Sequence, residues 1–136
     1  MPKKQIMVVE DSPIDFRFIE KAINSIDPAI EIIYSRDGQE AVELLEKPDI
    51  RPRLILTDLK MPRMNGHEFL QRIKADPGRK MTPVIMFSTS DDVADIEKSY
   101  LSHVNAYVVK PDSFTSYSKF ATFLKEFWLE HVTLPN

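Results

Sequence analysis

Five short runs of aliphatic and β-branched residues recur along the chain, separated by longer segments whose apolar residues follow helical spacing. Buried strands of a parallel sheet have this nearly continuous apolar character, and neighbouring parallel strands need a crossover segment between them, usually a helix. The pattern therefore predicts an α/β fold, a doubly wound parallel sheet of five strands with five helices. The expected strands span residues 5–9, 31–34, 54–57, 84–87 and 106–109.

Capping residues mark where the helices begin. Ser12 can accept a hydrogen bond from the first-turn amides, and Pro13 suits the first helical position because its missing N–H is not needed there. Asp37 and Asn65 each precede a glycine at the expected start of the second and third helices. The expected helices run from 13 to about 25, from 38 to before 48, from 66 to before 76, from a cap at 91 or 92 to about 101, and from about 114 to before 135.

Length and composition fit one domain, which we expect to span residues 1–136, and they exclude several classes of function. Without cysteine there are no thiolate metal sites, thiol nucleophiles or disulfides. Three glycines at distant positions cannot form a Walker loop or a dinucleotide-binding triplet. The net charge of −3 and the lack of a long apolar run lead us to expect no nucleic-acid partner, no membrane partner and a cytoplasmic location.

Ionisable and hydroxyl side chains stand directly after four of the expected strands, where ligands bind in open parallel sheets. They are Glu10 and Asp11 after the first strand, Asp58 after the third, Ser88 after the fourth and Lys110 after the fifth. If the first and third strands are neighbours, three carboxylates converge, and two of them about 4 Å apart repel by about 4 kcal/mol at an effective dielectric constant near 20. Such a cluster favours a hard divalent cation with oxygen ligands, Mg²⁺ rather than Ca²⁺.

Each of these side chains taken singly has a simpler structural interpretation. A carboxylate just before a helix often caps its first turn, and a lysine in a loop is often only a surface charge. Their coincidence at the ends of neighbouring strands favours a shared site instead. Lys110 is followed by Pro111, which restricts the local backbone, and its ammonium is a natural counter-charge for the acidic cluster.

Five motifs follow one another in an order and spacing typical of one protein family. They are VVEDS at 8–12, ILTDLKMP at 55–62, MNG at 64–66, PVIMFS at 83–88 and YVVKP at 107–111. With them the chain resembles, over essentially its whole length, the receiver domain of bacterial two-component signalling. The resemblance implies a flavodoxin-like fold with the strand order 2-1-3-4-5.

The resemblance also implies a metal site and a phosphorylation site. It makes Asp58 the phosphoacceptor, and it makes Glu10, Asp11, Asp58 and the backbone carbonyl of Lys60 the ligands of Mg²⁺. Glu10 stands where many receiver domains have aspartate. The family commonly tolerates this change, so we expect a functional site.

Three further residues receive roles from the same resemblance. Ser88 and Lys110 would contact the phosphoryl oxygens, and Ser88 and Tyr107 would form a switch that alters the surface of the fourth helix, fifth strand and fifth helix. Ser88 stands where many receivers have threonine. The implied protein is a stand-alone response regulator that catalyses its own Mg²⁺-dependent phosphorylation and dephosphorylation and turns over no separate substrate.

Other functions fit this sequence less well. A phosphatase of the haloacid-dehalogenase type needs a second aspartate two positions after its nucleophile, where this chain has Lys60. A flavodoxin-like mononucleotide binder needs a polar phosphate loop after the first strand, where Glu10 and Asp11 would repel phosphate. A pseudo-receiver that is never phosphorylated and acts only as an interaction or dimerisation module stays the alternative.

The last expected helix carries two apolar stripes rotated by about 90° from each other. One contains Tyr117, Ala121, Leu124 and Trp128, and the other contains Phe120, Phe123 and Phe127. One alternative is a wide core face beneath a neighbouring helix. We favour a surface formed by the three phenylalanines that binds a partner or a second copy of the chain.

The final residues FWLEHVTLP, at 127–135, resemble the tail of the small response regulators that pair with bacterial and cyanobacterial phytochromes. The lengths of the loops at 47–53 and 76–81 fit that subgroup too. This resemblance implies a sensor histidine kinase of the phytochrome type as the phosphoryl donor. It also implies a homodimer built on the last helices.

Overall fold

A computed structural model describes residues 4–135 and confirms the predicted α/β fold. Five parallel strands form one sheet in the order β2-β1-β3-β4-β5, which is the order that the family resemblance implied. The strands are β1 (Gln5–Val9), β2 (Glu31–Ser35), β3 (Leu54–Thr57), β4 (Val84–Ser88) and β5 (Ala106–Val109). Each lies within one residue of its predicted bounds.

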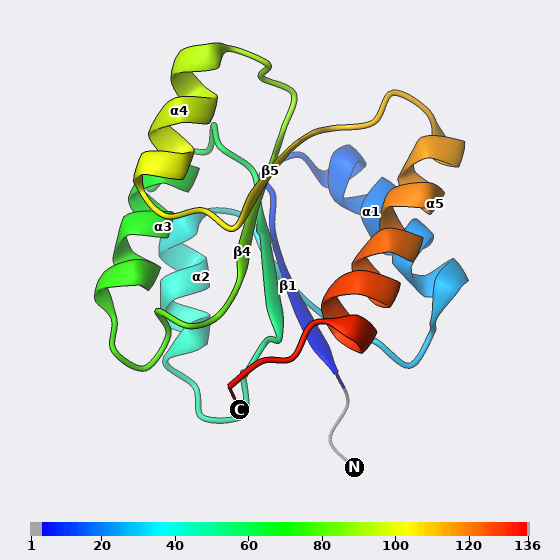
Figure 1. Cartoon of the computed structure of the whole chain (residues 1–136), viewed down its shortest axis with the longest axis horizontal. Coiled ribbons are helices and arrows are strands. Elements are labelled where there is room, and N and C mark those ends of the chain that lie inside the picture. Colours follow the sequence, from blue (N-terminus) through cyan, green and yellow to red (C-terminus); the bar gives the residue numbers. More distant parts are fainter. Residues whose placement is uncertain (1–3, 136) are drawn as a thin grey trace.

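Helices cover both faces of the sheet (Figure 1). α1 and α5 pack together on one face, and α2, α3 and α4 lie on the other. The helices are α1 (Pro13–Ile26), α2 (Gly38–Leu45), α3 (Gly66–Ala75), α4 (Val93–Leu101) and α5 (Phe114–Phe123), and α5 continues into η1 (Leu124–His131). The side chains of Ser12, Asp37 and Asn65 cap their helices as predicted, and Asp92 rather than Asp91 caps α4.

The sheet separates two apolar clusters, because alternate residues of a strand point to opposite faces. In β1, Ile6 and Val8 enter the cluster beneath α1 and α5, whereas Met7 and Val9 enter the cluster beneath α2 and α3. All four side chains are buried. The central strands are therefore held on both faces, and their carboxyl ends are fixed in position relative to each other.

The end of the last helix differs from the prediction. The chain stays helical to His131, but from Leu124 onward it forms a π-helix, in which hydrogen bonds run from residue i to i+5. Leu124 and Leu129, five residues apart, are both buried, while Trp128 is only partly buried. The predicted buried stripe, calculated at 100° per residue, is therefore confirmed as far as Leu124. Beyond that point Leu129, rather than Trp128, is the buried residue.

The three phenylalanines of the other stripe do not share one environment. The ring of Phe120 stacks on Phe87 at 4.8 Å between centroids and packs against the core. Phe123 and Phe127 are 48% and 43% exposed, and their rings stack on each other at 5.3 Å. The exposed part of the predicted surface therefore consists of Phe123 and Phe127.

Within residues 4–135, none of the helices is both long enough and apolar enough to cross a lipid bilayer.

Gly66 stands at the first position of α3, in close contact with the loop that carries Asp58. Its amide donates a hydrogen bond to the carbonyl of Leu59 at 2.7 Å. A Cβ at this position would lie 2.3 Å from the carbonyl oxygen of Asp58 and 2.8 Å from the Cα of Leu59. Because both neighbours are backbone atoms, neither can turn aside.

We expect Gly66→Ala to lower the free energy of unfolding by about 2 kcal/mol, since an added methyl group in a closely packed site forces the backbone to shift. Gly78→Ala is the matched control, because the nearest atom to a Cβ there is Asp76 Oδ1 at 3.4 Å. Its effect should stay within about 0.5 kcal/mol. Urea denaturation measures both variants, and equal losses would contradict the close approach at Gly66.

Candidate functional site

The register of the sheet brings the predicted acidic residues together. Val9 of β1 pairs with Thr57 of β3, so Glu10 and Asp11 leave β1 at the level where Asp58 leaves β3. The amide of Asp58 donates to the carbonyl of Val9 at 2.8 Å and extends this pairing by one residue. One carboxylate oxygen from each of Glu10, Asp11 and Asp58 lies within 4.8 Å of the other two.

The ammonium of Lys110 lies inside this acidic group. Its Nζ is 2.7 Å from Glu10 Oε1, 2.9 Å from Asp15 Oδ2 and 3.2 Å from Asp58 Oδ2. An ammonium has three N–H donors, so the three carboxylates can occupy all of them. The Lys110 side chain is only 5% exposed, and the backbone amide of Lys110 donates to the carbonyl of Ser88 at 2.8 Å, which aligns the ends of β4 and β5.

Asp15, which contacts Lys110, was not among the site residues that the sequence predicted. It lies in the first turn of α1, four residues after Asp11, and the side chain of Ser12 accepts a hydrogen bond from its amide at 3.2 Å. A helix that begins so soon after a strand places its first turn at the strand end. That proximity, together with the capping signal at Ser12, was the available clue.

Burial and neighbouring charges shift the pKa values at this site. Burial raises the pKa of Glu10 to about 8, and its contact with Asp58 adds to this effect while Lys110 opposes it. Burial alone would lower the pKa of Lys110, but hydrogen bonds to Glu10 and Asp15 outweigh it and raise that pKa. In the chain without a metal ion, this shift favours the protonated form of the Glu10 carboxyl, which lowers the repulsion among the carboxylates.

The donor atoms of the cluster suit a hard divalent cation. All three side chains offer oxygen, and Asp11 is exposed while Glu10 is buried, so a cation can reach the cluster from solvent through Asp11. Lys60, whose backbone carbonyl is predicted as a further ligand, lies two residues beyond Asp58 in the loop that leads to α3. It lines a cavity of about 340 Å³, together with Leu59, Met61, Asn65, His67 and Asp95.

The two predicted switch residues are joined through a third residue, Ser90. The hydroxyl oxygen of Ser88 accepts a hydrogen bond from the amide of Ser90 at 3.1 Å. The hydroxyl of Tyr107 donates to the carbonyl of Ser90 at 2.9 Å, and the hydroxyl of Ser90 donates to Asp95 Oδ2 at 2.6 Å. A displacement of the loop after β4 must therefore change the contacts of Tyr107 and of α4.

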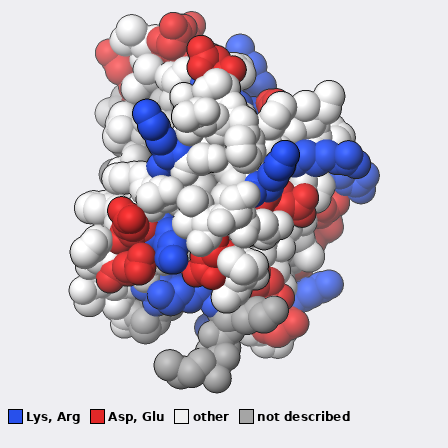
Figure 2. Space-filling model, turned by 90° about the vertical axis from the view of Figure 1, so that its right-hand side faces the viewer, with Lys and Arg blue, Asp and Glu red and all other residues white. Residues whose placement is uncertain are grey.

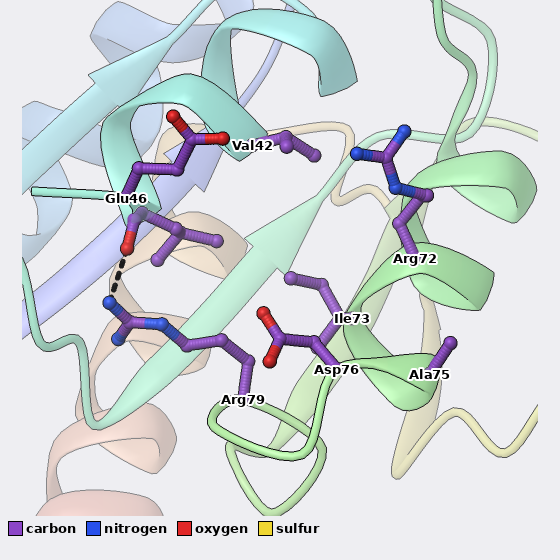
Figure 3. A pocket seen from close by; sticks show the side chains of 8 residues that line it. Val42, Glu46, Arg72, Ile73, Ala75, Asp76 and Arg79 are labelled. Carbon is purple, nitrogen blue, oxygen red and sulfur yellow. Dashed lines mark hydrogen bonds between the residues drawn. The ribbon is translucent and has the colours of Figure 1, made fainter.

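A different pocket, of about 310 Å³, lies between the C-terminal parts of α2 and α3 (Figure 3). These helix ends lie toward the amino ends of the strands, at the opposite edge of the sheet from the acidic cluster. The guanidinium of Arg79 donates to the carbonyl of Leu45, at the last residue of α2. Arg72 and Asp76 also line the pocket, so its charges are of both signs. The Arg79 contact satisfies a helix-end carbonyl, which is a structural role.

Comparisons with known proteins agree with this arrangement. Residues 6–118 match the family described as "Response regulator receiver domain". The chain is 37% identical over 139 residues to the response regulator Rcp1 of Synechocystis sp., and the match covers 98% of this chain and 95% of Rcp1.

Two solved structures cover 98% of this chain and 99% of their own. The phosphorylated cyanobacterial phytochrome response regulator RcpA is 38% identical with a TM-score of 0.92. The Mn²⁺-bound form of Rcp1 is 37% identical with a TM-score of 0.86.

In the absence of divalent cations, we expect the free energy of unfolding to fall as the pH rises from about 5 to about 8. The Glu10 carboxyl has a pKa of about 8 in the folded chain and near 4.5 when unfolded. Between these values the folded state holds more protons than the unfolded state, so raising the pH favours unfolding. The raised pKa of Lys110 acts only at more alkaline pH.

Urea denaturation in EDTA at several pH values measures this slope. Glu10→Gln cannot ionise at this position, so its slope should be shallower than that of the unmodified chain. Parallel slopes for the two proteins would show that Glu10 does not carry the pH dependence.

Proposed function

Because this chain belongs to the response regulator receiver family, we propose that it is a response regulator whose Asp58 accepts a phosphoryl group from a sensor histidine kinase. The observation that carries the proposal is the position of the Asp58 carboxylate, which lies within 4.8 Å of oxygens of Glu10 and Asp11 and 3.2 Å from the Lys110 ammonium. Family membership confirms the resemblance that the five motifs indicated. The proposed unit is one receiver domain of residues 1–136.

The side chain of Asp58 can act as a nucleophile without a general base, because an ionised carboxylate has no proton to lose. One of its oxygens attacks the phosphorus of a phosphohistidine, the new P–O bond forms, and the P–N bond breaks with its electron pair returning to the imidazole. Asp58 Oδ1 accepts a hydrogen bond from the amide of Leu59 at 2.7 Å, which fixes the orientation of the carboxylate. The Lys110 ammonium balances charge on the transferred group.

We propose Mg²⁺ as the cation, held by Glu10, Asp11, Asp58 and the backbone carbonyl of Lys60. The oxygen donors of the cluster support a hard ion, and the Mn²⁺-bound form of Rcp1 supports a divalent one. When bound, the ion would neutralise negative charge on the phosphoryl oxygens. Ion binding also favours an ionised Glu10, so the raised pKa of this carboxyl, about 8, opposes ion binding at neutral as well as at low pH.

Phosphorylation of Asp58 adds close to two negative charges where the acidic residues already meet. We propose that the Ser88 hydroxyl and the Lys110 ammonium bind the added oxygens. Drawing Ser88 toward Asp58 displaces Ser90, whose carbonyl accepts the hydrogen bond of Tyr107. The change then reaches the surface formed by α4, β5 and α5, which we propose as the output surface.

We further propose that the phosphoryl donor is a histidine kinase of the phytochrome type. RcpA is a phytochrome response regulator and its structure is of the phosphorylated form. The tail at 127–135 supports the same subgroup, and this chain is similar to RcpA and Rcp1 over nearly its full length.

Phe123 and Phe127 support a homodimer. Both rings are on the outer side of the last helix, and Figure 2 shows uncharged side chains gathered over the middle of the face formed by α1 and α5. Phe18 of α1 is also partly exposed and stacks on Tyr117 of α5 at 5.5 Å. A second copy of the chain is the proposed occupant, because two-fold pairing buries the same apolar patch on both subunits.

Incubation with acetyl phosphate and Mg²⁺ should produce a retarded band on a Phos-tag gel. Asp58→Asn should abolish the band, because it removes the nucleophile. Asp112→Asn, at an exposed position two residues after Lys110, is the control and should leave the band unchanged. A band that survives Asp58→Asn would mean that the acceptor is another residue. If the unmodified chain gives no band, the pseudo-receiver becomes the better interpretation.

Phe123→Asp and Phe127→Asp should each convert a dimer to a monomer in sedimentation velocity, because a carboxylate in the interface would lose its hydration. Both rings are well exposed, so circular dichroism and thermal midpoint should change little. Leu101→Asp, at an exposed side chain at the end of α4 on the other face of the sheet, is the control and should stay dimeric. Unfolding of the Phe123 and Phe127 variants would instead place these rings in the core, and a monomeric unmodified chain would exclude the dimer.

A further inference from the structure

Three carboxylates share the Lys110 ammonium, and they differ in what else they can bind. Glu10 and Asp58 belong to the cluster of oxygens within 4.8 Å that suits a divalent cation. Asp15 is not part of that cluster in the described chain, although its Oδ2 lies only 2.9 Å from Lys110 Nζ. Asp15 can therefore keep its contact with the ammonium when the other two carboxylates turn to a cation.

We propose that Asp15 is a positioning residue: it gives the Lys110 ammonium an ionic partner outside the cation ligands and so increases the affinity of the site for divalent cations. This inference rests on the proposed function, because it takes Glu10, Asp11 and Asp58 as the ligands. Asp15 acts through Lys110 and makes no contact with the ion or the phosphoryl group.

The position of Asp15 suits this role. Its backbone is fixed in the first turn of α1, where Ser12 Oγ accepts a hydrogen bond from the Asp15 amide. Its side chain is 33% exposed, whereas that of Glu10 is buried, so part of the Asp15 carboxylate stays in contact with water. A partly hydrated carboxylate on a rigid helix start is a suitable anchor for a buried ammonium.

Competition between Lys110 and a divalent cation for the same carboxylates determines whether Asp15 strengthens or weakens cation binding. Without Asp15, the ammonium would have only Glu10 and Asp58 as partners, and both are proposed cation ligands. A divalent cation would then have to displace Lys110 from both carboxylates and leave a largely buried ammonium without a counter-charge, which is unfavourable. With Asp15 present, the ammonium keeps one ionic partner throughout.

Mn²⁺ affinity, measured by isothermal titration calorimetry on the unphosphorylated chain, tests the proposal. We expect Asp15→Asn to weaken Mn²⁺ binding about tenfold, the lower end of the range for residues that orient metal ligands. Asp15→Glu keeps a carboxylate near Lys110 and should bind within about threefold of the unmodified chain. Glu20→Gln, which removes one negative charge from the middle of α1, is the control and should bind Mn²⁺ normally.

A double-mutant cycle with Lys110→Met separates positioning from simple charge. If Asp15 acts through Lys110, Asp15→Asn should have little effect in the Lys110→Met background. An equal tenfold loss in both backgrounds would overturn the positioning role. So would unchanged Mn²⁺ affinity in Asp15→Asn, even if its thermal midpoint fell, because that result would mark Asp15 as only a stabiliser of the helix start.

Failure of the proposed function gives a different result. If the unmodified chain does not bind Mn²⁺, or if Asp58→Asn binds it as tightly as the unmodified chain, the cation site itself is wrong. If Asp58→Asn weakens binding and Asp15→Asn does not, the site stands and only the role of Asp15 falls.

Discussion

Four carboxylates and one ammonium meet at the carboxyl edge of the sheet, and the balance among these charges governs the rest of the site. Like charges at short range in a region largely removed from water repel strongly, so the cluster persists only with a counter-charge. Lys110 provides it through contacts of 2.7 to 3.2 Å with Glu10, Asp15 and Asp58. Burial and the contact with Asp58 raise the pKa of Glu10 against the effect of Lys110, and the convergence of carboxylate oxygens suits a divalent cation. A group that carries additional negative charge into this site must rearrange the contacts of Lys110.

Hydrogen bonds connect the end of β4 to two elements of the proposed output surface, β5 and α4. Ser88 ends β4 beside the acidic cluster, and Ser90 connects it by hydrogen bonds to Tyr107 in β5 and to Asp95 in α4. The bond between Ser88 and Ser90 lies within the loop after β4, and the other two bonds join this loop to β5 and α4, so a small movement of the loop alters its contacts with both elements. Because the sheet is packed on both faces, the strands themselves are poorly able to absorb the movement. We therefore expect the response in the loop after β4 and in α4.

Much of the fold and most of the site could be predicted before any coordinates were known. The strand positions followed from continuous apolar runs, and the helix starts followed from Ser12, Asp37 and Asn65, because both signals are local. Asp15 and Ser90 were missed because their importance depends on contacts with Lys110 and Tyr107, which are distant in the chain. The π-helix was missed because a helical wheel assumes a constant rotation per residue, and no capping side chain marks the change of pitch at Leu124.

The sequence by itself determined which elements form, in which order they alternate, and which residue types stand at the strand ends. These properties depend on the spacing of apolar residues and on side chains that bond to their own backbone within a few residues. Only the tertiary structure decided which of those side chains touch. The register of β1 against β3 sets the meeting of Glu10 with Asp58, and the docking of α1 beside the strand ends adds Asp15 to the ammonium of Lys110. Packing likewise placed Phe120 against the core and left Phe123 and Phe127 exposed, because burial depends on what lies opposite a side chain and not on its position in a helical pattern.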